Sequence, residues 1–204
     1  MNFQLFSAFL FITVILFLTP GPIVTLVVST GASRGTRAAL AVVAGSSCGN
    51  ALLIAAIACG LSFVVNNAAI LFEILRWSGA AYLIWLGIQV WRNADRAVTM
   101  LPPAGGVYFT RGMLVALSNP KTIAFFTAFL PQFVDPALPV EPQLAVMCVT
   151  SVLLGAVLDS GWATAAGYGR SWFLAPARAK LLGRVSGLAL IGGGIWLSLA
   201  RRPA

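Results

Sequence analysis

The sequence contains very little charge. Only 9% of its 204 residues are Asp, Glu, Lys or Arg, whereas 59% are hydrophobic, and the mean hydropathy is +0.93. A soluble domain carries about 25% charged residues, so this chain lacks the polar side chains that would cover a water-exposed surface. The composition excludes a soluble globular protein and predicts an integral membrane protein.

Histidine is absent, and there are three cysteines. Cys48, Cys59 and Cys148 each lie inside an apolar run, and none belongs to a C-x-x-C motif. The usual ligands of a soft metal ion and the usual residues of a thiol relay are therefore missing. We expect no metal site and no cofactor, and we interpret the three thiols as small buried side chains.

Acidic residues are scarce as well. Five of them stand against 13 Lys and Arg, so that the formal net charge is +8. A basic balance can indicate nucleic-acid binding, but these basic residues are scattered between apolar runs and form no cluster with aromatic side chains. We expect no nucleic-acid partner, and the composition predicts a lipid bilayer as the surroundings of the chain.

Long apolar runs, bounded by charged or turn residues, occupy most of the chain. A helix needs about 20 mainly apolar residues to cross the hydrocarbon core. The runs are continuous rather than alternating, which excludes lipid-facing strands. We expect an all-α, multi-pass membrane protein with one transmembrane domain over residues 1–204. Its six helices are expected near 4–30, 38–65, 70–91, 110–133, 143–168 and 182–200.

Positive charge predicts the orientation of these spans, because short cytoplasmic loops are enriched in Lys and Arg. The connections after the first, third and fifth runs hold nine basic residues, whereas those after the second and fourth hold none. The fourth connection carries Asp135 and Glu141 instead, and only Arg201 and Arg202 at the C-terminus oppose the trend. Both termini are therefore expected outside. The nine basic residues are Arg34, Arg37, Arg92, Arg96, Arg111, Arg170, Arg178, Lys180 and Arg184.

Two patterns recur about 100 residues apart. The tetrads Arg76-Trp77-Ser78-Gly79 and Arg184-Val185-Ser186-Gly187 open the third and sixth runs, and the first and fourth runs are each interrupted by a proline cluster, Thr19-Pro20-Gly21-Pro22 and Ser118-Asn119-Pro120-Lys121. Each half would hold three spans, an odd number, so related halves would insert in opposite orientations. We expect two inverted three-helix repeats, over about 4–91 and about 110–200.

The proline clusters are candidates for a substrate site. Proline removes a backbone donor and clashes with the preceding turn, so it frees carbonyl groups and opens a helix N-terminus inside the membrane. A helix N-terminus carries partial positive charge and suits a carboxylate. The alternative is a pair of ordinary kinks whose free groups bond to neighbouring helices. The matched breaks favour a site, and its expected residues are Thr19, Pro20, Gly21, Pro22, Asn119, Pro120 and Lys121.

Four residues on different runs are predicted to lie at similar depth near the centre of the bilayer. Each lies 10 to 13 residues from an arginine at the inner end of its run, or roughly 15–20 Å along a helix. A charged group at that depth costs about 2.5–3.5 kcal/mol on insertion scales, so Lys121 and Asp159 should not face lipid. A structural Lys121–Asp159 ion pair is one explanation for two charged residues at this depth, and a substrate site is the other. The four residues are Gly21, Asn50, Lys121 and Asp159, and Asn50 is therefore added to the expected substrate-binding residues.

With these motifs the chain resembles the lysine/threonine exporter family, the LysE/RhtB type of bacterial amino-acid exporters. The resemblance runs from about residue 4 to residue 200. It implies a protein of the bacterial inner membrane that exports amino acids or close derivatives, driven by the proton motive force. The motifs on which the resemblance rests include, in order, Thr19-Pro20-Gly21-Pro22, Gly79-Ala80-Ala81-Tyr82-Leu83, Asn119-Pro120-Lys121 and Pro131-Gln132-Phe133.

The resemblance does not choose the substrate. One acid, Asp159, and one base, Lys121, are predicted near mid-depth, with no second carboxylate to meet a cationic side chain. This favours a neutral or homoserine-like amino acid, and the alternative is a basic amino acid or another small solute.

Asp159 is expected to carry the coupling proton, because it is the one carboxylate predicted near the centre of the bilayer. Burial disfavours its ionised form and a nearby ammonium group favours that form, so protons become the second expected partner. In the rival role, Asp159 binds the ammonium group of the substrate directly.

Two other classes of protein are disfavoured. An intramembrane enzyme would need an acid/base set, yet there is no histidine and no second membrane aspartate beside Asp159. A non-transporting membrane scaffold would need neither buried charges nor matched helix breaks. We expect a transporter and not an enzyme, and the sequence leaves a homo-oligomer open.

Overall fold

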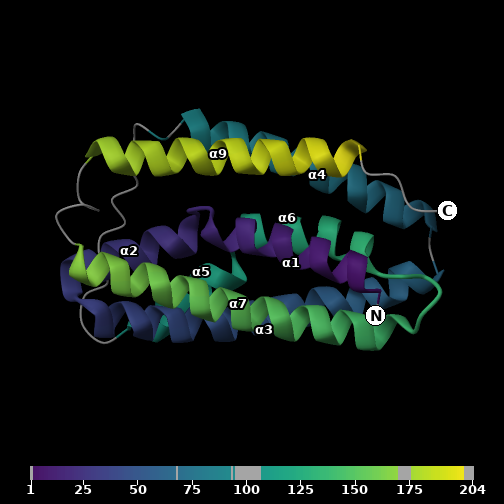
Figure 1. Cartoon of the computed structure of the whole chain (residues 1–204), viewed down its shortest axis with the longest axis horizontal. Helices are drawn as coiled ribbons and strands as arrows, with labels where there is room; N and C mark the ends of the chain where they lie inside the picture. The colour runs from purple at the N-terminus through teal and green to yellow at the C-terminus, as the bar shows by residue number, and fades with distance from the viewer. Residues whose placement is uncertain (1, 68, 93, 95–106, 170–175, 200–204) are drawn as a thin grey trace.

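A computed structural model describes residues 2–67, 69–92, 94, 107–169 and 176–199, and all of the regular secondary structure in these ranges is helical. The helices lie roughly along the long axis of the molecule (Figure 1). In chain order they are α1 (Phe3–Leu18), α2 (Pro22–Arg34), α3 (Thr36–Asn67), α4 (Ala69–Arg92), α5 (Tyr108–Leu117), α6 (Pro120–Phe129), the 3-10 helix η1 (Leu130–Phe133), α7 (Val140–Tyr168) and α9 (Pro176–Leu199).

Two of these helices are long and apolar enough to cross a membrane unaided: α3, over Thr36–Gly60, and α7. Two bent pairs add a span each if each pair is counted as one, since α1 meets α2 at 48° and α5 meets the α6–η1 segment at 44°. Both bends fall at the proline clusters. The all-helical prediction is confirmed for the described ranges, which contain two to four spans by this measure. The six-span arrangement stays a prediction, with α4 and α9 as its third and sixth helices.

The expected start of the third helix, near residue 70, agrees with α4, which begins at Ala69, whereas α9 begins at Pro176 and not near residue 182. The prediction that the R-x-S-G tetrads open the two helices is wrong, because each tetrad lies about two turns inside its helix. Apolar runs mark only the part of a helix in hydrocarbon, whereas long basic side chains let the same helix continue into the polar interface. Pro176, whose fixed φ suits the first position of a helix, is the better start signal.

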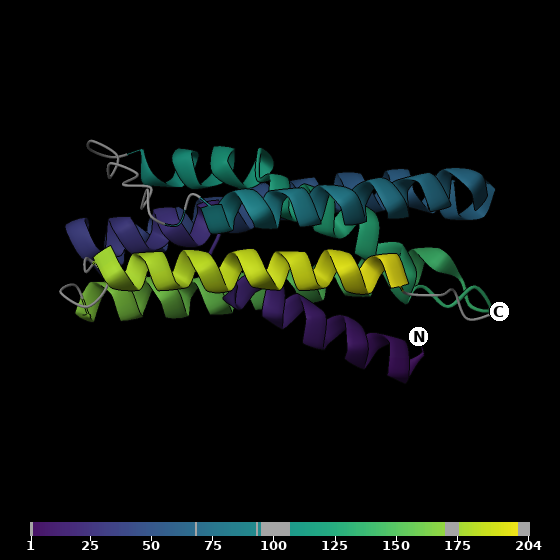
Figure 2. The same cartoon turned by 90° about the horizontal axis from the view of Figure 1, so that it is seen from above.

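The broken pairs lie in the middle of the molecule. α4 and α9 pack along each other on one side, α3 and α7 pack on the other, and α1, α2 and α6 lie between them (Figure 1). The view from above shows α4 beside α9, and it shows α1 diverging from the bundle toward its N-terminus (Figure 2). This arrangement places both helix breaks where several helices surround them.

Glycines set the distance between the helices that pack most closely. A Cβ added at Gly49 would lie 2.6 Å from the carbonyl oxygen of Met113, and one added at Gly45 would collide with the backbone of α5. Between α4 and α9, a Cβ on Gly87 would lie 2.7 Å from the carbonyl oxygen of Gly187, and the reverse substitution gives the same distance. Small residues let backbones approach in this way in membrane helices.

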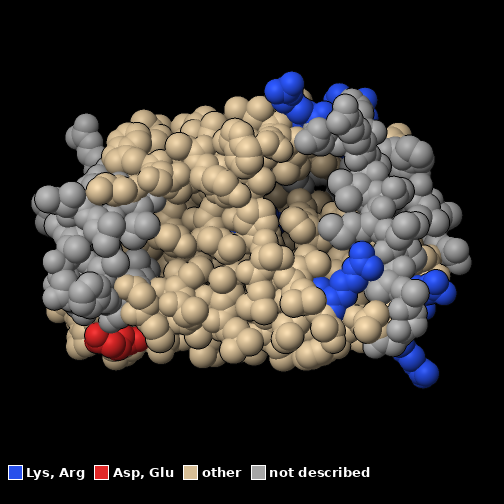
Figure 3. All heavy atoms as spheres, turned by 180° about the vertical axis from the view of Figure 1, so that it is seen from behind, with Lys and Arg blue, Asp and Glu red and all other residues tan. Residues whose placement is uncertain are grey.

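Charge separates along the long axis. Arg34 ends α2 and Arg111 lies in the first turn of α5 at one end of the molecule, the basic end, whereas Asp135 and Glu141 lie at the connection from η1 to α7 at the opposite, acidic end. On the face in Figure 3 the visible Lys and Arg side chains gather toward one end and the Asp and Glu side chains at the other. Other residues of the charge count lie outside the described ranges, namely Arg96, Arg170, Arg201 and Arg202.

The prediction that the cysteines are buried is wrong for two of them. Cys48 and Cys59 are exposed on α3, and Cys148 is half-buried. Lipid is as apolar as the core of a helix bundle, so an apolar run does not reveal which face of its helix is covered by protein.

Candidate substrate site

The two helix breaks have similar local structure. α1 ends at Leu18 and α2 begins at Pro22 after an extended Gly21, with φ of −142° and ψ of −167°. α5 ends at Leu117, and α6 begins at Pro120 after Asn119, which is also extended. In each break a proline occupies the first position of the second helix, where its missing N–H is not needed.

Lys121 connects the two breaks. Its side chain is 6% exposed, and its ammonium group donates to the carbonyl oxygens of Leu16, at 2.7 Å, and Thr19, at 2.6 Å. The last carbonyls of a helix have no partner within the helix and carry partial negative charge. Lys121 therefore caps the C-terminal end of α1, and no direct ion pair with Asp159 is formed in the described part of the chain.

Gly21 lies against Lys121. A Cβ on Gly21 would lie 3.2 Å from Cδ and 3.3 Å from Nζ of that lysine, so a larger residue would crowd the ammonium group. Gly21 is the N-cap residue of α2, as Asn119 is of α6, so the first break meets Lys121 at the residue that precedes its second helix.

Asn119 organises the first turn of α6. Its side-chain oxygen accepts from the backbone N–H of Lys121 at 3.2 Å, and its amide nitrogen donates to the hydroxyl of Thr122 at 2.8 Å. Asn119 and Thr122 are each 2% exposed. An asparagine at this position is a preferred N-cap, and it fixes the turn that carries Lys121.

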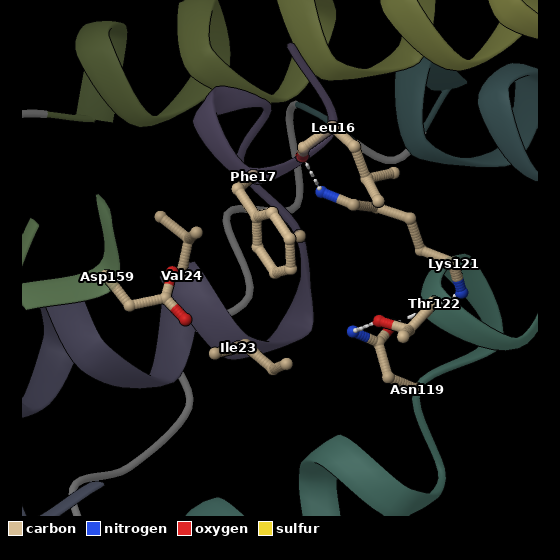
Figure 4. A pocket seen from close by; sticks show the side chains of 9 residues that line it. Leu16, Phe17, Ile23, Val24, Asn119, Lys121, Thr122 and Asp159 are labelled. Atoms are coloured by element: carbon tan, nitrogen blue, oxygen red, sulfur yellow. Dashed lines mark hydrogen bonds between the residues drawn. The ribbon is translucent and has the colours of Figure 1, made fainter. Parts of the chain in front are cut away.

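Asp159 approaches from α7 and is 2% exposed. Its oxygen Oδ1 is buried and has no hydrogen-bond partner among the residues that the structure describes. Buried polar atoms nearly always have a partner, so this oxygen marks a place where a proton, a water molecule or a ligand group is expected. Figure 4 shows Asp159 and Lys121 on opposite sides of the pocket, with the ring of Phe17 drawn between them.

These groups line one cavity (Figure 4). Its volume is about 20 Å³, which is room for about one water molecule, so an amino acid requires the walls to move apart. It lies between two apolar clusters: an aromatic cluster that contains Leu16 and extends along α1 and α6, and an aliphatic cluster that contains Ile23. The lining residues are Leu16, Phe17, Gly21, Ile23, Val24, Asn119, Lys121, Thr122 and Asp159.

Most of the predicted site residues meet here. Gly21, Asn119, Lys121 and Asp159 line the cavity, and Thr19 takes part through its carbonyl oxygen. Pro20, Pro22 and Pro120 shape the breaks without lining the cavity.

Asn50 is the exception, since it is buried on α3 with its oxygen Oδ1 lacking a described partner but does not line the cavity. It stands 109 residues before Asp159, close to the 108 between the tetrads. This spacing is the one expected of a counterpart of Asp159 in the first of the two predicted repeats.

The sequence did not select five of the lining residues, namely Leu16, Phe17, Ile23, Val24 and Thr122. Thr122 could have been selected from the sequence, because it directly follows Lys121. Phe17 carries no such signal, because a phenylalanine in an apolar run looks the same whether it faces lipid, core or cavity. Its ring packs against α7, where a Cβ on Gly155 would lie 2.7 Å from it.

Comparison with known proteins identifies the family. The family model described as LysE type translocator matches residues 14–201. The chain belongs to this family. It is 35% identical to the homoserine/homoserine lactone efflux protein of Salmonella typhimurium, over 98% of this chain and 99% of the relative. It is 34% identical to an uncharacterized membrane protein of Vibrio cholerae over 98% of this chain and all of that relative. A leucine efflux protein of Salmonella choleraesuis is 31% identical over 60% of this chain and 59% of that relative.

No solved structure matches the chain. The resemblance drawn from the sequence motifs is thereby confirmed at the level of the family. The family and its efflux relatives are translocators and membrane proteins, not enzymes.

Proposed function

We propose that this LysE-family translocator exports a neutral amino acid or a close derivative, of the homoserine type, across the bacterial inner membrane. The observation that carries the proposal is the cavity between the two helix breaks, which holds one buried amine and one buried carboxyl group. An amino acid bears the two complementary charges. The full-length relative named for homoserine and homoserine lactone efflux supports the neutral substrate class.

Lys121 serves the substrate carboxylate in this proposal. An ammonium group has three donors, and two of them are used by α1. The third donor and the N-terminal end of α6 are left for an anionic group, which both favour. Thr19, Pro20, Gly21 and Pro22 hold the opposite wall, and Asn50 joins the site from the first repeat once the walls move apart.

Asp159 serves as the coupling residue, so that transport is an exchange of substrate for protons. Its unpartnered oxygen faces the cavity side that Lys121 does not reach. Protonation removes the buried negative charge when the site is empty, and arrival of the substrate ammonium group displaces the proton. Direct pairing of Asp159 with the substrate ammonium group is the alternative, and the two roles are separated by experiment below.

Alternating access follows from the two apolar clusters. The aromatic cluster closes the cavity toward the acidic end, and the aliphatic cluster closes it toward the basic end. Movement of one inverted repeat against the other would open each closure in turn. The basic end faces the cytoplasm in this proposal, in keeping with the distribution of Lys and Arg.

Flux measurements in proteoliposomes test the function. Vesicles loaded with labelled homoserine should release it faster with the protein than without it, and an inward proton gradient should increase the release. Unlabelled lysine should compete less well than homoserine. Labelled leucine should be tested in the same assay, because the relative that matches 60% of this chain is a leucine efflux protein. Release that matches protein-free vesicles for every amino acid would contradict the proposal.

A further inference from the structure

We infer that Thr122 selects substrates whose side chain carries a hydrogen-bond-accepting oxygen, by donating its hydroxyl proton into the cavity. The inference rests on the proposed export of amino acids and concerns the side chain of the substrate. It requires that Thr122 faces the cavity and that its hydroxyl proton is not used within the described part of the protein. Room for the substrate side chain comes from the separation of the cavity walls that the proposed function already needs.

Thr122 faces the cavity from the first turn of α6. It lines the cavity together with Asn119 and Lys121, and it is 2% exposed. Figure 4 shows its hydroxyl beside the Asn119 amide. A hydroxyl group so deeply buried needs hydrogen-bond partners for its oxygen and for its proton.

The direction of the Asn119–Thr122 bond is determined by its neighbours. The backbone N–H of Lys121 can only donate, so the Asn119 atom that it contacts is the oxygen, and the atom that contacts Thr122 is the NH₂ nitrogen. That nitrogen has no acceptor capacity. The Thr122 oxygen is therefore the acceptor of this bond, and its own O–H remains to be donated elsewhere.

Within the described part of the chain, no acceptor takes that proton. A hydroxyl group in a helix usually donates to a carbonyl one turn earlier, as Ser151, Ser160 and Thr164 do here. Thr122 stands at the start of α6, directly after the break, where the preceding turn is not helical. The break thus creates a buried donor beside the cavity that has no acceptor among the described residues.

A substrate oxygen is the partner that fits this donor. With its carboxylate at Lys121, an amino acid places its side chain near the next residue of α6. The hydroxyl oxygen of homoserine can accept the Thr122 proton. An alkyl side chain cannot, and it would leave the donor buried without a partner, a penalty that gives strong discrimination in sites built to bind a hydroxyl group.

A pair of substrates of equal size isolates this interaction. Homoserine and norvaline differ only in a terminal hydroxyl against a terminal methyl group. We expect proteoliposomes with the unmodified protein to release homoserine about tenfold faster than norvaline at equal subsaturating loads. Thr122→Val, which replaces the hydroxyl by a methyl group, should reduce this ratio to about one, mainly by slowing homoserine. Thr122→Ser should retain the preference.

A matched control and the unmodified protein make the test decisive. Thr164→Val changes an exposed threonine on α7 whose hydroxyl donates to Ser160, and it should leave the ratio unchanged. An unmodified protein that releases both substrates at equal, protein-dependent rates overturns the inference while amino-acid export stands. A preference that persists in Thr122→Val overturns it too. If neither substrate nor any other amino acid is released, the proposed function fails together with it.

Discussion

At the scale of single residues, Lys121 combines a structural contact with a proposed binding role. Its two carbonyl acceptors belong to α1, the helix before the first break. A charged donor at these carbonyls stabilises the end of α1, and the same positive charge is available to a carboxylate. These two roles predict separate effects on stability and on binding.

We predict that Lys121→Met lowers the stability of the protein and weakens substrate binding. The substitution leaves the carbonyls of Leu16 and Thr19 buried without a donor, which should cost about 1–3 kcal/mol. It also removes a charge from the membrane, so insertion should persist. Thermal unfolding of the detergent-solubilised protein measures the first effect, and equilibrium binding of homoserine measures the second.

A methyl ester of the substrate separates the two effects. The unmodified protein should bind homoserine more tightly than its methyl ester, because the ester lacks the carboxylate charge. In Lys121→Met this difference should disappear. If the substitution weakens the binding of acid and ester by the same factor, Lys121 does not bind the carboxylate and acts on α1 alone.

Asp159 is the residue by which coupling can be tested. We predict that Asp159→Asn loses export against a concentration gradient but retains exchange of labelled for unlabelled substrate, because a neutral amide keeps the shape of the site and cannot release a proton. Uphill release and exchange are measured in the same proteoliposome preparation. Loss of both activities would identify Asp159 as a ligand of the ammonium group, and unchanged uphill export with unchanged pH dependence would show that it is structural.

At the scale of helices, α3 packs closely against α5, which is the first helix of the broken pair α5–α6. Gly49 lies at this contact, where a Cβ would be 2.6 Å from the Met113 carbonyl oxygen and 2.8 Å from the Ala116 side chain. Neither the Met113 backbone nor the short Ala116 side chain can move easily to make room for a Cβ atom. The spacing of the two helices therefore depends on the absence of a side chain.

We predict that Gly49→Ala destabilises the protein by about 1–3 kcal/mol, the usual cost of overpacking. Gly60→Ala on the same helix is the matched control, because a Cβ there meets nothing within 4 Å. Alanine is favoured over glycine in a helix by about 1 kcal/mol, so the control should be neutral or stabilising. Thermal unfolding in detergent gives both values, and equal destabilisation by the two substitutions would contradict the close contact.

At the scale of the whole molecule, the separation of charge predicts how the protein lies in the membrane. The basic end carries Arg34 and Arg111, and the acidic end carries Asp135 and Glu141. The positive-inside rule assigns the basic end to the cytoplasm. The start of α1 and the end of α9 share the acidic end (Figure 1), which agrees with both termini lying outside.

We predict that reporter fusions after Arg96 report the cytoplasm and that fusions within 135–141 report the periplasm. The reason is that nine Lys and Arg lie in the connections assigned to the cytoplasm and none in the other two, with Arg201 and Arg202 at the C-terminus as the two exceptions. Paired reporters that are active on opposite sides, such as a phosphatase and a fluorescent protein, give the answer for each position. The same side for both positions would reject the inverted repeats.

The sequence by itself determined the class of the protein and the location of its helix breaks. Apolar runs with almost no charge cannot fold in water, and prolines interrupt a helix wherever they occur in its interior. These effects depend only on composition and local chain geometry. For the same reason Asn119, Lys121 and Asp159 could be selected as site residues before any fold was known, because a polar residue in an apolar run requires a partner.

Only the tertiary structure decided which partner each group has. The sequence left open whether Lys121 pairs with Asp159, and the folded chain places its ammonium group on α1 carbonyls more than 100 residues earlier. It also selected Thr122 and Phe17 as lining residues and left Asn50 away from the cavity. In a membrane protein, lipid and protein interior are equally apolar, so hydrophobicity does not distinguish the faces of a helix. Those faces are assigned by packing, which glycines and helix breaks permit but which forms only when all the helices come together.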